Sequence, residues 1–119
     1  MKSWVLGAMA AFSTACSCGP GPSCPNDLPS TSACSSGIPS WQTDVQSIVV
    51  AKCAPCHRPG NLNAPLLDSW AAVSDAGGPV LDQTYRCAMP PPDAGTAWVL
   101  APQERHDLLL WLVCGAPNN

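Results

Sequence analysis

The sequence predicts a small all-α domain of about three to four short helices joined by long ordered loops. Three segments repeat apolar residues at the 3.6-residue spacing of helices, whereas no segment shows the alternation of a strand. The chain has only 119 residues, so it has room for one thin core. Loops this long in so small a domain indicate that something at the centre organises them.

The N-terminal residues 1–15 have the pattern of a signal peptide. One lysine precedes an apolar run from Trp4 to Phe12 and a stretch of small residues. This run is far shorter than the roughly 20 residues that span a membrane. The next residues, STAC, resemble a bacterial lipobox, although Ser13 stands where a large aliphatic residue is usual. We therefore expect lipidation at Cys16, which would anchor the domain to a membrane surface, with simple cleavage as the alternative.

Residues 16–40 are expected to form a tether. They consist mainly of Ser, Pro, Gly and Cys, and they cannot bury enough apolar surface to offset the entropy of ordering. Export would bring the cysteines into an oxidising compartment, where thiols pair or are modified. We expect Cys24 and Cys34 to close a small loop within the tether. Pairing with Cys18 or with another chain is the alternative, because sequence alone does not define connectivity.

The structured domain is expected over residues 41–117, and its first helix over 43–52. Thr43 is a suitable N-cap, and Gln46 three residues later completes a capping box. Apolar and aliphatic side chains recur at helical spacing at Val45, Ile48, Val49 and Lys52. This helix runs directly into a pair of cysteines.

A second helix is expected between Pro65 and Ser74, with Asp68 or Ser69 as its cap. Residues 76–97 contain AGGP and CAMPPPDAG, which predict loop throughout.

The last helix has the clearest signals. Pro102 suits the first turn, Glu104 suits the positive N-terminal end, and Gly115 is a C-terminal stop. Its apolar face consists of Leu108, Trp111 and Leu112.

Cys53, Cys56 and His57 form the pattern C-x-x-C-H, which is the attachment motif for c-type haem. Two thiols on one helical turn can add to the two vinyl groups, and the adjacent imidazole then reaches the iron. The composition predicts on the order of 0.01 chance occurrences of this motif, so the match is informative. The alternatives are a Cys53–Cys56 disulfide, and a structural zinc held by these three residues and a fourth ligand such as Cys87.

Met89 is the expected sixth ligand of an iron bound by His57. It is the only methionine that remains once the signal peptide is removed. Three prolines follow it and stiffen its loop, which lowers the entropic cost of holding a weak thioether ligand in place. The alternative is an exposed methionine in a surface loop.

Cys87 and Cys114 are expected to form a disulfide that fastens the Met89 loop to the last helix. In the chain-entropy model such a bridge stabilises the fold by about 3 to 4 kcal/mol. Pairing with the tether cysteines is the alternative.

The pattern CAPCH, the downstream Met-Pro and the terminal segment PQERHDLLLWLVCGAP together resemble the small monohaem c-type cytochromes of exported bacterial proteins and lipoproteins. The resemblance covers roughly residues 41–117. It implies a cytochrome c-like fold around one covalent haem c, with thioether links at Cys53 and Cys56 and axial ligation by His57 and Met89. It also implies an electron carrier of the periplasm or cell envelope, not an enzyme, with transient redox partners.

Two other functions are open at this point. One is a haem enzyme or gas sensor, peroxidase-like in chemistry, whose iron is five-coordinate because Met89 does not bind; its only adjacent acid/base candidates, Arg105 and His106, are expected to face solvent. The other is a haem-free binding module stapled by disulfides or zinc. Nucleic-acid binding is not expected, because a net charge of -3 provides no basic stripe.

Overall fold

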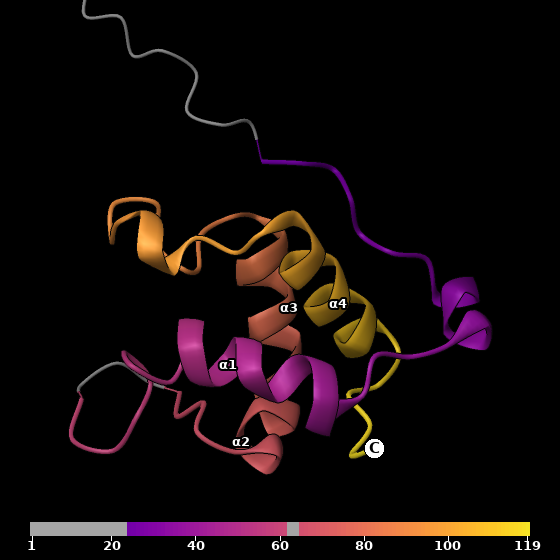
Figure 1. Cartoon of the computed structure of the whole chain (residues 1–119), viewed down its shortest axis with the longest axis horizontal. Helices are drawn as coiled ribbons and strands as arrows, with labels where there is room; N and C mark the ends of the chain where they lie inside the picture. The colour runs from indigo at the N-terminus through magenta and orange to yellow at the C-terminus, as the bar shows by residue number, and fades with distance from the viewer. Residues whose placement is uncertain (1–23, 62–64) are drawn as a thin grey trace, which may run out of the picture.

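Four α-helices and three short helical turns build the described residues, 24–61 and 65–119, of this computed structural model, and no strand occurs among them (Figure 1). The predicted all-α class is therefore confirmed. In chain order the elements are η1 (Thr31–Ser36), η2 (Trp41–Val45), α1 (Gln46–Lys52), α2 (Trp70–Asp75), α3 (Gly77–Tyr85), η3 (Thr96–Trp98) and α4 (Pro102–Val113). Across these two ranges, no helix has both the length and the apolar character needed to cross a membrane. The signal peptide, the lipidation at Cys16 and the partner of Cys18 concern positions outside the described residues.

The first helical stretch begins earlier than predicted. The turn η2 leads directly into α1, so the chain is helical from residue 41 to residue 52. Ser40, not Thr43, is the cap: its hydroxyl accepts a hydrogen bond from the Thr43 amide at 3.4 Å. In turn, the Asp44 carboxylate accepts a hydrogen bond from the Ser40 amide at 2.7 Å. The predicted cap at Thr43 is therefore wrong, because Ser40 satisfies the free amides of this first turn.

Helix α2 confirms one of the two predicted caps. The Ser69 hydroxyl accepts from the Ala72 amide at 3.2 Å and fixes the start of the helix.

Helix α3 was not predicted, because its first residues, Gly-Gly-Pro, are typical of loops. Pro79 is only the third residue of the helix, where an amide has no partner within the helix in any case, so a proline is tolerated there. Val80 and Leu81 follow and pack against the core, which stabilises a helix that local sequence disfavours. The prediction of loop over 76–97 is wrong for 77–85.

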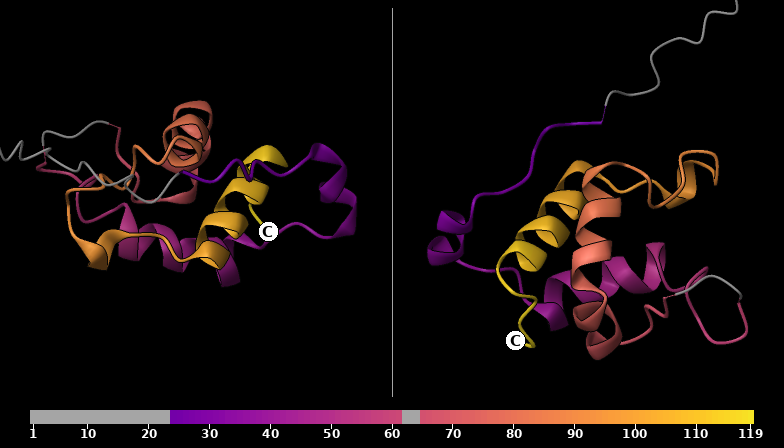
Figure 2. Two further views of the ribbon diagram at one scale, coloured as in Figure 1. Left: turned by 90° about the horizontal axis from the view of Figure 1, so that it is seen from above. Right: turned by 180° about the vertical axis from the view of Figure 1, so that it is seen from behind.

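Helix α4 provides the centre of the core. Trp111 and Leu109 are completely buried, and Leu108 is almost so. The Trp111 ring packs against the Trp41 ring of η2 with centroids 5.3 Å apart, and its indole Nε1 donates to the Pro117 carbonyl at 2.9 Å. Helices α3 and α4 lie side by side, and α1 crosses α3 at a different level (Figures 1 and 2). The predicted start of α4 at Pro102 is confirmed, as is Gly115 beyond its end, which has φ 90°.

Residues 24–40 are not a free tether; they form a strap that lies along α4 (Figures 1 and 2). Two disulfides attach it to the domain, Cys24–Cys87 and Cys34–Cys114. Both predicted pairs, Cys24–Cys34 and Cys87–Cys114, are therefore wrong, and each strap cysteine pairs with a domain cysteine instead.

The reason for this pairing is the length of α4. Arg105, in the first turn of α4, contacts the C-terminal end of α3, which leads to Cys87. Cys114 lies nine residues after Arg105, and nine residues of helix span about 14 Å. A disulfide requires Cα atoms closer than about 7 Å, so Cys87 and Cys114 lie too far apart to pair.

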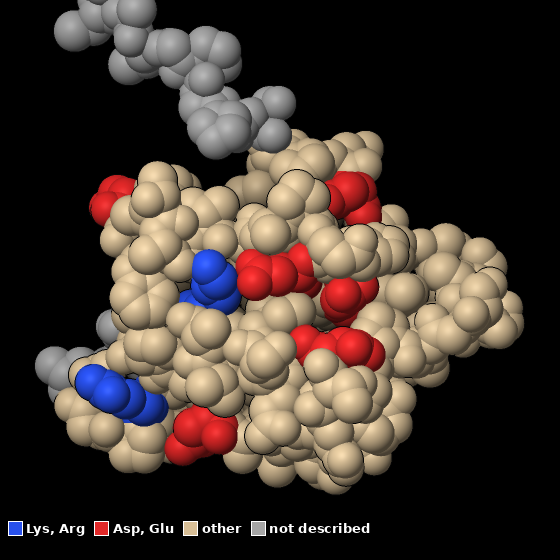
Figure 3. Space-filling view, in the orientation of Figure 1, with Lys and Arg blue, Asp and Glu red and all other residues tan. Residues whose placement is uncertain are grey.

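Charged side chains are sparse on the face of the molecule shown in Figure 3, where most of the surface is uncharged. The whole chain has five Lys and Arg residues and eight Asp and Glu residues.

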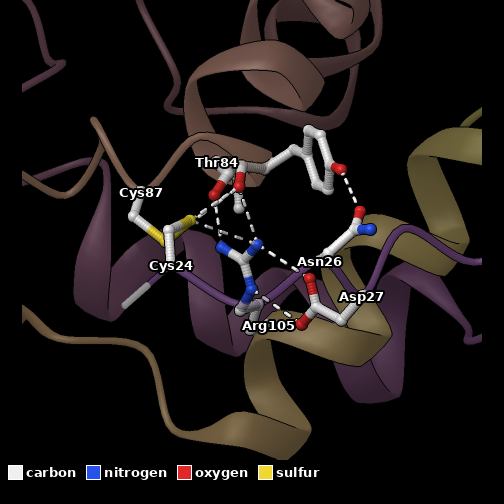
Figure 4. The surroundings of a disulfide bond; sticks show 7 residues. Cys24, Asn26, Asp27, Thr84, Cys87 and Arg105 are labelled. Carbon is white, nitrogen blue, oxygen red and sulfur yellow. Dashed lines mark hydrogen bonds and ion pairs between the residues drawn. A yellow bond between two sulfur atoms is a disulfide. The ribbon is translucent and has the colours of Figure 1, made fainter. Parts of the chain in front are cut away.

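The side chain of Arg105 is buried and does not face solvent. Only 7% of it is exposed, contrary to the prediction that it points outward. Its guanidinium binds both carboxylate oxygens of Asp27 at 2.9 Å, and it also donates to the carbonyls of Thr84 and Tyr85 (Figure 4). The hydrogen bonds and the positive charge of Arg105 lower the pKa of Asp27 below its ordinary value of 3.8.

We expect the Asp27→Asn variant to lose stability at neutral pH but not in strong acid. A carboxyl whose pKa is lowered on folding stabilises the fold above its unfolded pKa, and this contribution disappears as the pH falls through the folded pKa. The loss at pH 7 should be roughly 1 kcal/mol, because water screens a carboxylate that is 36% exposed. Urea unfolding of both proteins between neutral pH and strong acid measures the difference in their free energies of unfolding. This difference should shrink as the pH falls below the ordinary Asp27 pKa of 3.8. Asp93→Asn, an exposed loop substitution, is the control; a difference between Asp27→Asn and wild type that persists unchanged into acid would contradict the prediction.

Candidate functional site

A cavity of about 650 Å³ lies between α1, α3, α4 and the loop of residues 89–100. Its volume falls within the range of roughly 300 to 1,000 Å³ that is usual for ligand and cofactor sites. Its walls are mainly aliphatic, proline and aromatic side chains, with a few polar groups. The lining residues are Lys52, Cys53, Cys56, His57, Pro65, Leu67, Pro79, Val80, Gln83, Thr84, Met89, Pro90, Pro91, Ala94, Trp98, Leu100 and Leu108.

All four residues predicted to hold a cofactor line this one cavity: Cys53, Cys56, His57 and Met89. Cys53 is the first residue beyond α1, and its carbonyl accepts hydrogen bonds from the amides of Cys56 at 3.2 Å and His57 at 3.0 Å. This tight turn keeps the two thiols and the imidazole together. Met89 comes from a different part of the chain, so the fold brings together two motifs that are separate in sequence.

The His57 ring is held in a definite orientation. Its Nδ1 lies 2.8 Å from the Pro65 carbonyl oxygen, and a carbonyl can only accept, so Nδ1 carries the proton. With the proton on Nδ1, it is Nε2 of the neutral imidazole that has the free lone pair used to bind metals. The Leu67 amide donates to the His57 carbonyl at 2.8 Å and ties down the same turn.

The thiols of Cys53 and Cys56 are not paired with each other. Cys56 is exposed, whereas Cys53 is partly buried. Burial and the neighbouring Cys56 raise the pKa of the Cys53 thiol to about 11. The pair also lies at the C-terminal end of α1, where the helix dipole disfavours a thiolate. These surroundings favour a neutral Cys53 thiol over the reactive thiolate that a disulfide-exchange site needs.

We expect Cys53 to be alkylated much more slowly than Cys56 in chain in which both thiols are free. A rise in pKa from 9.0 to about 11 lowers the thiolate fraction at neutral pH about a hundredfold, and only the thiolate reacts. Iodoacetamide labelling at pH 7 followed by peptide mass spectrometry measures both rates, and the Cys53 rate should keep rising to about pH 11. Equal rates at the two cysteines would contradict the prediction.

Met89 is an exposed side chain that also lines the cavity. It is 41% exposed, and it lines the cavity together with Pro90 and Pro91. The amides of Ala88 and Met89 both donate to the Gln83 carbonyl, at 2.9 and 3.1 Å, so the backbone of this loop is anchored to α3.

The described side chains do not assemble the proposed zinc site. Cys87, the predicted fourth ligand, is bonded to Cys24. Among residues 24–61 and 65–119 no group of three or more His, Cys, Asp or Glu side chains is arranged to hold a metal ion. Structural zinc sites need four such ligands.

Several cavity residues were missed at the sequence level. Those from α3, such as Val80 and Gln83, were hidden because Gly-Gly-Pro predicted loop. Lys52 precedes the motif directly; its Nζ donates to the Ala97 carbonyl at 2.7 Å and links α1 to η3 at the cavity wall. The one sequence signal that could have placed Lys52 at the cavity is its position directly before Cys53.

Comparison of the chain with protein-family models, with curated proteins and with solved structures found no match. A function for the cavity is therefore inferred from the chemistry of its own side chains.

Proposed function

We propose that this protein carries single electrons by means of one c-type haem, covalently attached in the cavity. The observation that carries the proposal is that Cys53, Cys56, His57 and Met89 line one mainly apolar cavity. C-x-x-C-H supplies the two thiols and the adjacent imidazole that haem attachment needs.

The donor set fits such a group. Cys53 and Cys56 would form the thioether links, and His57 Nε2 and the Met89 thioether would be the iron ligands. When bound, the haem iron supplies reversible one-electron chemistry, and histidine/methionine ligation favours a high reduction potential.

The remaining cavity residues would set the environment of the haem. Aliphatic and aromatic walls such as Leu67, Trp98 and Leu108 exclude water, which disfavours the more highly charged oxidised state. Neither Arg105 nor His106 lines the cavity, so the two adjacent acid/base candidates are not beside the proposed haem. This supports an electron carrier over a five-coordinate haem enzyme or gas sensor.

The proposal places the domain in the periplasm or cell envelope, held at a membrane through a lipid on Cys16. It is supported by the signal-peptide and lipobox patterns at the start of the sequence. We propose redox proteins as transient partners. The sparse charge on the face in Figure 3 suits small contacts with little electrostatic steering.

The test is a visible spectrum of the protein expressed together with a haem-attachment system. We expect covalent haem, sharp bands in the reduced state and, in the oxidised state, the weak long-wavelength charge-transfer band of methionine-ligated haem. In Met89→Ala this band should disappear completely. Leu66→Ala is the matched control, because Leu66 is similarly exposed, 45% against 41%, but does not line the cavity.

Two results would contradict the proposal. High-spin haem that is indifferent to Met89 would indicate a five-coordinate, ligand-binding site. Failure to attach haem would refute both haem functions and leave the stapled binding module.

A further inference from the structure

We propose that Arg105 and the Cys24–Cys87 disulfide are positioning elements that hold the Met89 loop at the cavity. The inference rests on the proposed function, in which Met89 is an iron ligand. It assigns a role to the N-terminal strap, which sequence composition alone describes as a tether.

The first link is between Arg105 and the end of α3. The guanidinium donates to the carbonyls of Thr84 and Tyr85, the last two residues of that helix (Figure 4). The Thr84 carbonyl also accepts from the Cys87 amide at 3.1 Å. Arg105 thus caps α3 from α4. Because the guanidinium is buried and planar, it holds this helix end in one place.

The second link joins the strap to the same point. The two carboxylate oxygens of Asp27 accept from Nε and Nη2 along one edge of the Arg105 guanidinium, each at 2.9 Å. One residue before it, Asn26 accepts a hydrogen bond from the Tyr85 hydroxyl. Cys24 then forms the disulfide with Cys87 (Figure 4). The strap therefore contacts Arg105 of α4 by a charge pair, Tyr85 at the end of α3 by a hydrogen bond, and Cys87 just beyond α3 by a covalent bond.

The third link runs from this point to Met89. Cys87 has φ 58°, a left-handed conformation that non-glycine residues adopt only where their surroundings impose it. The chain reverses direction at this turn, and the Ala88 and Met89 amides both donate a hydrogen bond to the Gln83 carbonyl. The disulfide therefore lies two residues from the proposed ligand, on the turn that directs it.

The second disulfide makes the proposal testable. Cys34–Cys114 attaches the same strap at the other end of α4, away from the Met89 loop. Both bridges close long loops, with sequence separations of 63 and 80, so removing either one should affect the unfolded chain similarly. If the two disulfides only stabilised the fold as a whole, removing either one would have the same effect on the Met89 loop.

The experiment compares three variants of the full chain with wild type. Cys24→Ser/Cys87→Ser removes the near bridge, Cys34→Ser/Cys114→Ser removes the far bridge, and Arg105→Lys leaves a charge that cannot bind two carbonyls and a carboxylate together. One measurement is hydrogen exchange of the Ala88 and Met89 amides, which does not depend on haem. The other is the methionine charge-transfer band of the oxidised protein.

We expect exchange at Ala88 and Met89 to become about tenfold faster or more in the near-bridge variant and in Arg105→Lys, and to stay near wild type in the far-bridge variant. The charge-transfer band should weaken or vanish in the same two proteins alone. Arg105→Lys keeps the test decisive if the near-bridge variant does not fold.

Equal acceleration in both bridge variants, or no change at Ala88 and Met89 in any variant, would overturn the inference. The outcome for the proposed function is separate. If the exchange pattern is as expected but wild type shows no methionine band, the strap positions the loop, and it is the assignment of Met89 as a ligand that fails.

Discussion

On the proposed function, we expect the replacement of His57 by alanine to abolish stable haem binding and to lower the yield of haem-bearing protein by more than about tenfold. Among the described residues, His57 is the only histidine that lines the cavity, and its Nε2 is not engaged because the contact to the Pro65 carbonyl is made by Nδ1. Without this imidazole, the proposed haem would lack its histidine ligand. Haem staining of denatured protein and the visible spectrum of the native protein measure the loss.

His106→Ala is the matched control, because it removes the other histidine of the chain. His106 is exposed and does not line the cavity, which confirms the sequence prediction that it faces solvent. Its removal should leave haem content and spectrum unchanged. A loss of haem in His106→Ala equal to that in His57→Ala would show that the imidazole of the C-x-x-C-H motif has no special role.

Replacing Trp111 by alanine will destabilise the fold by about 3 to 5 kcal/mol, because it leaves a large void at the centre of the core. The side chain is completely buried, its ring stacks on Trp41, and its indole bonds to the Pro117 carbonyl. Small domains are stable by only about 5 to 15 kcal/mol, so this is a large part of the total. The melting temperature, followed by circular dichroism, should fall by about 10 °C or more.

Val50→Ala is the control for hydrophobic truncation. Val50 is on α1 and is 57% exposed, so its removal leaves no void. Stability should change by no more than about 0.5 kcal/mol. If the two substitutions reduced stability equally, α4 would not be the centre of the core.

Prediction from sequence succeeded where a structural signal and its partner lie within a few residues of each other. The start of α4 at Pro102 and the stop at Gly115 were predicted correctly, and Ser69 was one of the two caps predicted for α2. Each depends on backbone amides or carbonyls within one helical turn. The tight turn of C-x-x-C-H belongs to the same class, because its hydrogen bonds join residues three and four apart.

Prediction failed where the deciding partner is remote in sequence. Local composition disfavoured helix α3, which packs against the core and is capped by Arg105 from α4. Arg105 was expected in solvent because its partner Asp27 is 78 residues away, in a segment predicted to be a tether. Helix periodicity could not reveal a carboxylate that arrives from the strap.

The sequence by itself determined the helical class, the main ends of the last helix, and the residue types and spacing able to hold a haem. Those features follow from local hydrogen bonding and from the chemistry of single side chains. The tertiary structure alone decided which cysteines pair, that the strap lies along α4, and that Met89 reaches the same cavity as His57. These depend on distances between segments far apart in the chain, which composition and periodicity do not encode.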